Sequence, residues 1–502
     1  MIGQRLWVGI PETTISEETR QHLLTVNPGG VILFGRNVES RDQVSQLIDD
    51  LRSILGPSLL VSIDQEGGRV VRIPRGVSLF PGNLALGAAA RRNHQRALEL
   101  AQLQGQISGM ELRDLGIDVN LAPCVDLLRS STERGIGSRS FGSDPALASA
   151  LAERIGSGHR AQGVRDCWKH FPGIGRATVD PHFGLPRISA DDGEVHVAPF
   201  RVAATSGASM IMTSHVIADG LDAENPVTIS WKAVTGHLRQ EIGFSGVIIS
   251  DCLEMGGVSG FDFETVIAGA ARAGHDALLV SHTPELQLLA RQTLEQLQSS
   301  DPSFERTHQE SIRRLTALTM SNEIETRQLP SGSEVAEEIA RNGTTLLSGP
   351  RAIIEEGEKW LLVLSDLESR SPVEDPLRGE DLSHLIERLG ESVECFKIGS
   401  APDRAIIERV VARGSEAAGV IMALQGFRHS SEVTELVQAV AEADLRLIMV
   451  LLEDPRDLVA APSGDRVSVI SSFGFRPVHQ AAIASALLGE FEPSDRSPVE
   501  FF

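Results

Sequence analysis

The chain has 502 residues, which is enough for two or three domains with large apolar cores. Its formal net charge of −22 argues against binding to nucleic acid, which depends on basic surface. The opening residues show no basic region followed by an apolar core, and no apolar run reaches membrane-spanning length, so the sequence predicts a soluble cytoplasmic protein. Four widely spaced cysteines without CxxC pairs predict reduced thiols and no structural metal.

Short apolar runs alternate with longer stretches of helical periodicity over the first part of the chain. Eight such runs predict eight β–α units, the pattern of a (β/α)8 barrel whose active site forms at the carboxyl ends of the strands. The runs are RLWVGI, GGVILFG, LLVSID, DVNLAP, RDCWKHF, SMIMTSH, GVIISD and DALLVSH. The intervening helices are expected at Ser16–Thr25, Arg41–Leu55, Asn93–Leu115, Pro145–Ala161, Trp231–Ile242 and Phe263–Ala273.

Polar residues stand where several of these apolar runs end. Asp64 closes the third run, Lys169 and His170 lie in the fifth, His215 closes the sixth and Asp251 closes the seventh. Since a barrel brings the carboxyl ends of its strands to one mouth, these side chains are expected to gather there. The agreement between the fold and the placement of polar groups supports both predictions.

A second alternation of strands and helices follows a predicted linker, QLPSGSEV. Its apolar runs are KWLLVLSD, VECFKIG, GVIMALQ, LRLIMVLLE and VSVISSFG, with helices expected at Pro402–Arg413 and Ser430–Ala443. This pattern predicts a doubly wound α/β sandwich, and the lack of a GxGxxG motif after its first strand disfavours dinucleotide binding. The predicted division is a barrel over residues 1–327, a linker over 328–336 and the second domain over 337–502.

The segment KHFPGIGRATVDPHFGLP combines a cation, two imidazoles and a carboxylate at a strand end. Asp180 and His182 are two residues apart, which in an extended chain is roughly 6–7 Å, so contact between them requires a turn. Asp-Pro is a turn-initiating pair, and Pro181 fixes its own φ. A carboxylate bonded to one ring nitrogen would fix the histidine tautomer and leave the other nitrogen to transfer a proton. An isolated D-P-H would favour a solvent-exposed Asx turn, but the neighbouring Lys169 and His170 reverse that preference.

Three further segments carry candidate functional groups. IDQEGGRVVR places Asp64 and Arg72 around a Gly-Gly bend, although such charges often form only surface salt bridges. RGIGSRSFG presents Arg139 in a glycine-flanked loop, where a guanidinium can bind ligand oxygens or simply be solvated. GVIISD ends at Asp251, whose alternation continues the interior row of a strand, so function or a partner such as Lys169 or an arginine must justify the carboxylate.

Together these segments resemble glycoside hydrolase family 3, and within it the β-N-acetylglucosaminidase branch. The resemblance rests on IDQEGGRVVR, GSRSFGSDP, KHFPG with DPH, MTSH and the Ser250–Asp251 pair, all in the family's order. It covers the whole predicted barrel, and the tail ALLGEFEPSDRSPV is similar to the end of the family's second α/β domain. The combination of KHFPG with a D-x-H loop is the most specific part.

The resemblance implies a role for each matching residue. Asp251 matches the nucleophile, His182 the proton donor and acceptor, and Asp180 the carboxylate that orients the histidine. The residues that match those holding the sugar hydroxyls are Asp64, Arg72, Arg139, Lys169 and His170. In this family the anomeric configuration is retained. Other branches take their acid/base glutamate from the second domain, so that domain is expected to be mainly architectural here.

Three positions depart from the family pattern. Ile174 and Arg176 stand where histidine and aspartate are common, and Pro181 replaces a common serine. The first two change the charge of the loop and the third stiffens it, so activity or substrate preference is expected to shift. Glu254, just beyond the expected nucleophile, is also unusual.

The predicted function is that of a retaining exo-β-N-acetylglucosaminidase that needs no cofactor or metal and removes terminal GlcNAc from small glycans. The family's usual role suggests cell-wall muropeptides of the GlcNAc–anhydro-N-acetylmuramic acid type. Aromatic residues make up only 4% of the chain, which favours a short substrate because aromatic faces are the usual stacking platforms. The sequence leaves the oligomeric state open.

Four alternatives remain at this point. One alternative is a phosphorolytic enzyme on the same scaffold, because a neutral imidazole repels phosphate less than a carboxylate does. A Schiff-base lyase would use Lys169. A metal-dependent hydrolase would use His170, His215 and Asp251, although no HxH pair begins such a site. A weakened or non-catalytic sugar-binding homologue would explain the three departures but not the intact Asp180, His182 and Asp251.

Overall fold

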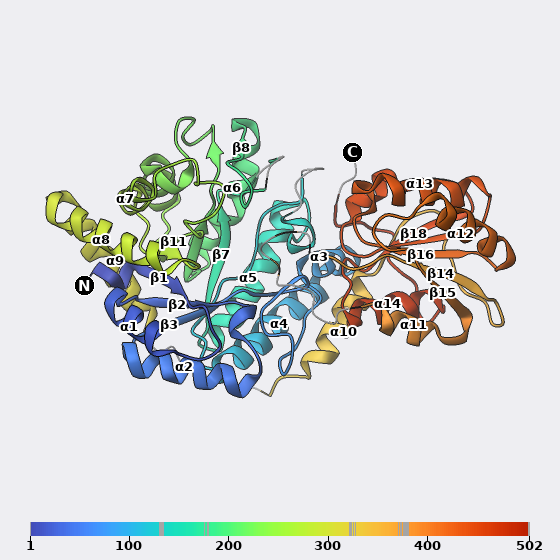
Figure 1. Ribbon diagram of the computed structural model, residues 1–502, viewed down its shortest axis with the longest axis horizontal. Coiled ribbons are helices and arrows are strands. Elements are labelled where there is room, and N and C mark those ends of the chain that lie inside the picture. Colours follow the sequence, from blue (N-terminus) through green and yellow to red (C-terminus); the bar gives the residue numbers. More distant parts are fainter. Residues whose placement is uncertain are drawn as a thin grey trace.

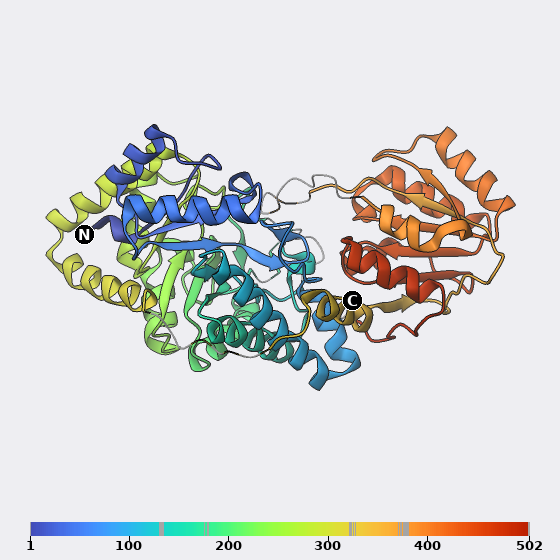
Figure 2. The same cartoon turned by 90° about the horizontal axis from the view of Figure 1, so that it is seen from below.

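The protein forms two lobes joined along one side (Figures 1 and 2). The computed structural model describes every residue except 1, 130–134, 175, 178–179, 321–323, 325, 327, 370, 372–373, 375–380 and 500–502. The first lobe is an eight-stranded parallel barrel and the second is a six-stranded α/β sandwich, which confirms the predicted fold class. Within the described residues, no helix has the length and hydropathy that crossing a bilayer requires.

The eight predicted barrel strands all form, and neighbours in the chain order are neighbours in the sheet. A parallel bridge between Ile249 and Ala277 links the two end strands and closes the barrel. The strands are β1 (Leu6–Gly9), β2 (Gly30–Leu33), β3 (Leu60–Ile63), β6 (Val119–Asn120), β7 (Arg165–Phe171), β9 (Met210–Thr213), β11 (Val247–Ser250) and β12 (Leu278–Val280). Apolar side chains such as Trp7, Leu121, Met210 and Ile249 fill the interior, as expected for a packed barrel.

Helices cover the outside of the barrel, and local capping explains where several of them begin. The hydroxyl of Ser40 accepts the amide of Gln43 at the start of α2, and Asp144 caps α5 with Pro145 in its first turn. The helices are α1 (Glu17–Val26), α2 (Arg41–Leu55), α3 (Asn83–Arg92), α4 (His94–Asp114), α5 (Pro145–Ala161), α6 (Ala190–Thr205), η5 (Lys232–Glu241), α7 (Phe263–Ala273), α8 (Pro284–Ser300) and α9 (Pro302–Leu318). The predicted bounds of α2, α5 and α7 are confirmed.

The second lobe has the strand order β15-β14-β16-β17-β18, with β13 added antiparallel at the edge beside β18. This is the order of a doubly wound sheet. Its strands are β13 (Thr345–Ser348), β14 (Trp360–Leu364), β15 (Val393–Lys397), β16 (Val420–Leu424), β17 (Leu447–Leu451) and β18 (Val467–Ser471). Its helices are α11 (Ser383–Leu389), α12 (Arg404–Glu416), α13 (Ser431–Glu442) and α14 (Pro477–Leu487). The sequence pattern missed β13, since an edge strand is short and only partly buried.

The junction between the lobes contains a helix, α10 (Gly332–Gly343), which begins inside the predicted linker. It lies between α3 and α14 (Figure 1). The domain boundaries themselves stay a prediction. Buried apolar residues from both lobes, Leu84, Leu128 and Phe473 among them, also form a shared cluster. The second lobe therefore packs against the barrel and is not merely tethered to it.

Candidate active site

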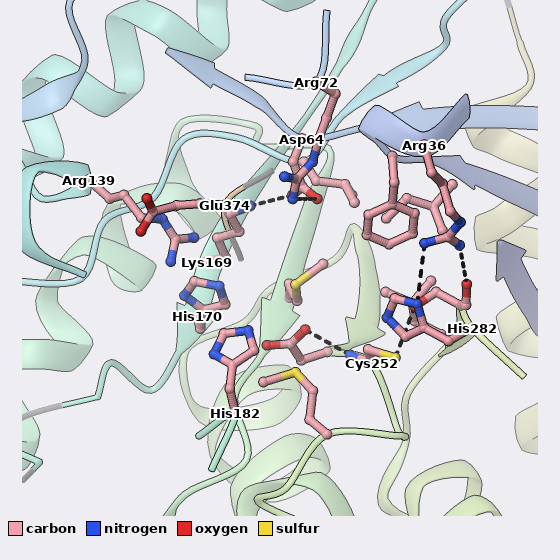
Figure 3. Close-up of a pocket in the computed structure, with 18 residues that line it drawn as sticks. Arg36, Asp64, Arg72, Arg139, Lys169, His170, His182, Cys252, His282 and Glu374 are labelled. Atoms are coloured by element: carbon pink, nitrogen blue, oxygen red, sulfur yellow. Dashed lines mark hydrogen bonds and ion pairs between the residues drawn. The ribbon is translucent and has the colours of Figure 1, made fainter. Parts of the chain in front are cut away.

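A cavity of about 380 Å³ opens at the carboxyl ends of the barrel strands (Figure 3). Seven of the eight predicted site residues line it, and Asp180 stands directly behind His182. Residues from the loops after β2, β3, β7, β11 and β12 contribute, as the barrel fold requires. The lining includes Phe34, Arg36, Asp64, Arg72, Leu121, Arg139, Lys169, His170, His182, Met212, Asp251, Cys252, Ser281, His282 and Glu374.

The predicted contact between Asp180 and His182 is confirmed. Nδ1 of His182 lies 2.6 Å from Oδ1 of Asp180, and the His182 backbone amide donates to the same oxygen at 2.9 Å. The chain turns at Pro181, so the two side chains meet, although an extended chain would hold residues two positions apart roughly 6–7 Å from each other. Burial alone would oppose the charge on Asp180, but its bonds to His182 hold the pKa of the carboxyl below its usual range. An ionised Asp180 thus accepts a hydrogen bond from Nδ1–H of His182, and Nε2 is left for proton transfer.

Asp251 follows β11 and is held by its backbone and by its neighbour. Its amide donates to the carbonyl of Thr213 at 3.1 Å, and its Oδ1 accepts the amide of Cys252 at 2.7 Å. Val247 and Ile249, which precede it on the same face, belong to the barrel interior as the alternation predicts. The half-buried carboxylate therefore continues an apolar row into the cavity.

A buried network of four charges forms one wall of the site. Nζ of Lys169 lies 2.7 Å from both Asp64 and Glu66, and Arg139 donates two hydrogen bonds to Glu66 at 2.8 and 2.9 Å. Burial alone would raise the pKa values of both carboxyls, but the neighbouring cations hold them below their usual range. For Lys169, burial opposes the charge, yet the two carboxylates raise its pKa above the usual value. All four groups are therefore charged at neutral pH.

This arrangement corrects one expectation and weakens one alternative. Lys169 was expected to accompany Asp251, but its two ion-pair partners are Asp64 and Glu66. An amine whose pKa is raised is also a poor nucleophile, because Schiff-base chemistry requires the neutral form. Lys169 therefore does not suit the lyase mechanism.

Replacing Lys169 by methionine should destabilise the protein by about 3–5 kcal/mol at neutral pH, because two buried carboxylates lose their shared cation. Carboxyls with lowered pKa values stabilise the fold above their ordinary pKa, near 4, and this stabilisation is lost as the pH falls through the lowered values. In the variant these carboxyls protonate more readily, so the difference from wild type should shrink on acidification. Urea denaturation at several pH values measures both effects.

The matched control for this experiment is Lys232→Met, because the Lys232 side chain is 65% exposed. It should change the free energy of unfolding by no more than about 0.5 kcal/mol. A Lys169→Met protein as stable as wild type at pH 7 would show that the buried network is not ionised.

Asp126, which the sequence reading overlooked, anchors His170. Its Oδ2 lies 2.6 Å from Nδ1 of His170, and its Oδ1 accepts the amide of Ile174 at 3.2 Å. Asp126 lies in the loop after β6, so a carboxylate shortly beyond a predicted strand was the available signal. The contact leaves Nε2 of His170 facing the cavity.

Cys124, Asp126 and His170 are the one trio of possible metal ligands that the described residues bring together. Burial raises the pKa of the Cys124 thiol well above its usual value, so it stays protonated. Asp126 is already engaged with His170, which explains the trio as a hydrogen-bonded support. The predicted metal alternative also involved His215, whose nitrogens lie 2.7 Å from the Thr228 hydroxyl and 2.8 Å from the Cys252 carbonyl. His215 therefore has a structural role.

The three positions that depart from the family pattern leave the Asp180–His182 pair intact. Ile174 is buried in the barrel core and Arg176 is exposed. The carbonyl of Pro181 accepts the amide of Gly257 at 2.8 Å, which ties the loop to the turn after Asp251. Glu254 points away from this chemistry and accepts three successive amides, starting at Ser281, within 2.7–2.8 Å.

Two walls of the cavity were not predicted. Glu374 comes from the second lobe and pairs with Arg69 of the barrel. On the other side, Arg36 and His282 face the cavity, and Arg36 lies over the ring of Phe34 at 4.4 Å (Figure 3). No local motif signals these residues, since the fold brings them together from distant segments.

Comparisons with known proteins agree with this geometry. The family model described as glycosyl hydrolase family 3 N terminal domain matches residues 2–318. A β-hexosaminidase of Thioalkalivibrio sulfidiphilus is 37% identical over 278 residues, which cover 55% of this chain and 80% of the relative.

Solved structures extend the similarity. A glycoside hydrolase family 3 β-N-acetylglucosaminidase from Paenibacillus sp. str. FPU-7 has a TM-score of 0.89 at 30% identity, covering 99% of this chain and 98% of its own. NagZ from Neisseria gonorrhoeae, solved in complex with N-trifluoroacetyl-D-glucosamine, has a TM-score of 0.53 at 28% identity and covers 63% of this chain and 98% of its own.

The fold and these matches define the chain as an enzyme of the glycoside hydrolase class. It belongs to glycosyl hydrolase family 3, and its relatives there are the β-hexosaminidases.

Proposed function

We propose that this protein is a retaining exo-β-N-acetylglucosaminidase in which Asp251 is the nucleophile and His182 the acid and base. The observation that carries the proposal is the Asp180–His182 pair, which presents one imidazole to the cavity that Asp251 also lines. A retaining glycosidase needs a nucleophile and a proton donor on the two sides of the anomeric carbon. Here the histidine takes the place of the second carboxyl.

The reaction proceeds in two displacements. In the first, an oxygen of Asp251 attacks C1 of the sugar, the glycosidic C1–O bond breaks, and Nε2 of His182 gives its proton to the departing oxygen. In the second, Nε2 takes a proton from water, the water oxygen bonds to C1, and the ester bond to Asp251 breaks. Asp180 accepts a hydrogen bond from the Nδ1–H of His182 throughout, so the ring keeps its orientation and the positive charge of the imidazolium is stabilised.

The buried charges hold the terminal sugar in this mechanism. Lys169 pairs directly with Asp64, and Glu66 links Lys169 to Arg139, so these groups need little reordering when a substrate arrives. Arg72, whose guanidinium lies 3.3 Å from Asp64, and His170 complete the group of polar side chains that face the sugar hydroxyls. The N-acetylglucosamine specificity is supported by the relatives, one of which was solved with an analogue of that sugar.

For the aglycone we infer a small acidic sugar of the anhydro-N-acetylmuramic acid type. The cavity holds only about 380 Å³, which suits a short substrate. The wall formed by Phe34, Arg36 and His282 offers a cation and an aromatic face on the side away from Glu374 (Figure 3). A guanidinium there matches the lactyl carboxylate of a muramic acid. The cytoplasmic setting predicted from the sequence accompanies this substrate as part of the proposal.

The proposal is tested by turnover of nitrophenyl N-acetyl-β-glucosaminide and nitrophenyl β-glucoside, each with and without phosphate. The N-acetyl substrate should be hydrolysed with a kcat/KM at least about a hundredfold higher, because the hydrogen bonds to the acetamido group are lost in the glucoside. Phosphate should not change the rate, and the released sugar should be free GlcNAc. Phosphate-dependent turnover that yields the sugar phosphate would instead establish phosphorolysis, and no turnover of either substrate would favour a non-catalytic protein.

The inferred aglycone is tested separately by comparing GlcNAc–anhydro-N-acetylmuramic acid with chitobiose. The acidic disaccharide should have the lower KM, and the advantage should weaken at high ionic strength as the charge of Arg36 is screened. Equal KM values for the two disaccharides would overturn the acidic aglycone and leave the glycosidase assignment intact.

A further inference from the structure

The Asp180–His182 pair of the barrel has a third hydrogen-bonding partner, and that residue comes from the second lobe. The hydroxyl of Ser371 donates to Oδ2 of Asp180 at 3.2 Å, while Oδ1 of the same carboxylate bonds His182. Ser371 is only 5% exposed, and Asp180 is similarly enclosed, with 8% of its side chain exposed. Each oxygen of Asp180 therefore has its own donor, one from each lobe.

The part of the second lobe that carries Ser371 is fixed to the barrel by buried charges. Arg69, in the loop after β3, forms ion pairs with Glu374 and, at 3.1 Å, with Glu453. All three side chains are no more than 4% exposed. Ser138 of the barrel adds a hydrogen bond to Glu453 at 3.2 Å. Because separating buried ion pairs leaves uncompensated charges, this contact holds the two lobes in one position.

We propose that Ser371 is a positioning residue for the acid–base step, so that the proton transfer performed in the barrel depends on the second lobe. The donor on Oδ2 keeps the carboxylate from rotating, and this keeps Oδ1 aimed at Nδ1 of His182. Ser371 does not reach the substrate and acts only through Asp180. The inference rests on the proposed roles of Asp180 and His182, and it assigns the second lobe a task beyond the architectural one expected from the sequence.

The similarity to shorter relatives bears on this assignment. The Neisseria gonorrhoeae NagZ chain is covered over 98% of its length by only 63% of this chain. The Paenibacillus enzyme instead matches along 99% of this chain. A chain of the shorter length, matched by only part of this one, has no equivalent of the whole second lobe. The contact between Ser371 and Asp180 is therefore a feature of the longer chains.

The test compares Ser371→Ala with Ser371→Thr in the full-length protein. The substrates are phenyl N-acetylglucosaminide, whose leaving group needs a proton, and dinitrophenyl N-acetylglucosaminide, whose leaving group does not. Ser371→Ala should lower kcat/KM about tenfold on the phenyl substrate, the size expected when a hydrogen bond to a charged group is lost. On the dinitrophenyl substrate kcat/KM should change less than about twofold. Ser371→Thr retains the hydroxyl and should restore most of the phenyl activity.

The matched control is Ser468→Ala, which removes a second-lobe hydroxyl that donates to the carbonyl of Pro350 at 2.7 Å. It should leave the ratio of the two kcat/KM values unchanged. A Ser371→Ala protein that loses activity equally on both substrates, or behaves like Ser468→Ala, would overturn the positioning role. The proposed function is judged independently by His182→Ala on the same substrates, so a failure of one inference is not mistaken for a failure of the other.

Discussion

Asp251→Asn is expected to reduce the hydrolysis of nitrophenyl N-acetylglucosaminide by about four orders of magnitude or more, the largest effect of any single substitution in this chain. An amide cannot form the glycosyl ester, so the first displacement is blocked. Asparagine has nearly the shape of aspartate, and its side-chain oxygen can still accept the Cys252 amide that Asp251 accepts at 2.7 Å. The loss should therefore appear in kcat with little change in the thermal unfolding temperature.

Added azide provides a sharper form of this test. In Asp251→Ala the side chain ends at its first carbon, so a small anion can occupy the space that the carboxylate leaves and attack C1 directly, with the dinitrophenolate as leaving group, which gives a glycosyl azide of inverted configuration. Azide should therefore restore turnover of dinitrophenyl N-acetylglucosaminide in the variant but not in the wild type. A variant that retains more than about one percent of wild-type activity without azide would contradict the assignment of Asp251 as nucleophile.

His182→Ala is expected to have the second largest effect, and its size should depend on the leaving group. For phenyl N-acetylglucosaminide, kcat/KM should fall by about 10²–10⁴, because the departing oxygen no longer receives a proton. For the dinitrophenyl substrate, kcat/KM should stay within about tenfold of wild type. The kcat of that substrate should still fall, since water must then attack the glycosyl ester without a base. Steady-state kinetics over a series of phenols measures this dependence as a steeper slope against leaving-group pKa.

His94→Ala serves as the control for the histidine variant, because His94 is exposed on the outside of the barrel at the start of α4. It should leave the whole series of phenols unchanged. Equal losses across good and poor leaving groups in His182→Ala would show that His182 is not the proton donor. Such a result would also remove the basis for the role of Ser371.

Much of this site could be predicted from the sequence because its signals are local. Asp64, Lys169 and Asp251 follow or end apolar runs, and parallel strands of a barrel bring such positions to one mouth. The Asp180–His182 contact was predictable for the same reason, since a turn at Pro181 suffices to form it. The predicted bounds of α2 were confirmed, and its first turn is capped by the side chain of Ser40.

The partners of the buried charges could not be predicted, because they depend on how distant segments meet. Lys169 was expected beside Asp251, yet it binds Asp64 and Glu66, about a hundred residues earlier in the chain. Glu374 could not be predicted as a site residue for the same reason, since its position beside the cavity follows from the packing of one lobe on the other. Sequence patterns report which groups become buried, whereas pairing among them is decided by the tertiary fold.

The two glycines after Asp251 give the site a further property. A side chain at Gly256 would place its first carbon 2.5 Å from the carbonyl oxygen of His182, and one at Gly257 would come within 3.2 Å of the Pro181 carbonyl. The backbone at Pro181 and His182 thus packs directly against the backbone of the two glycines, at a separation that only glycine permits. At Gly256 even alanine would displace the backbone of His182, and with it the imidazole. The position of the catalytic imidazole therefore depends on a glycine at residue 256.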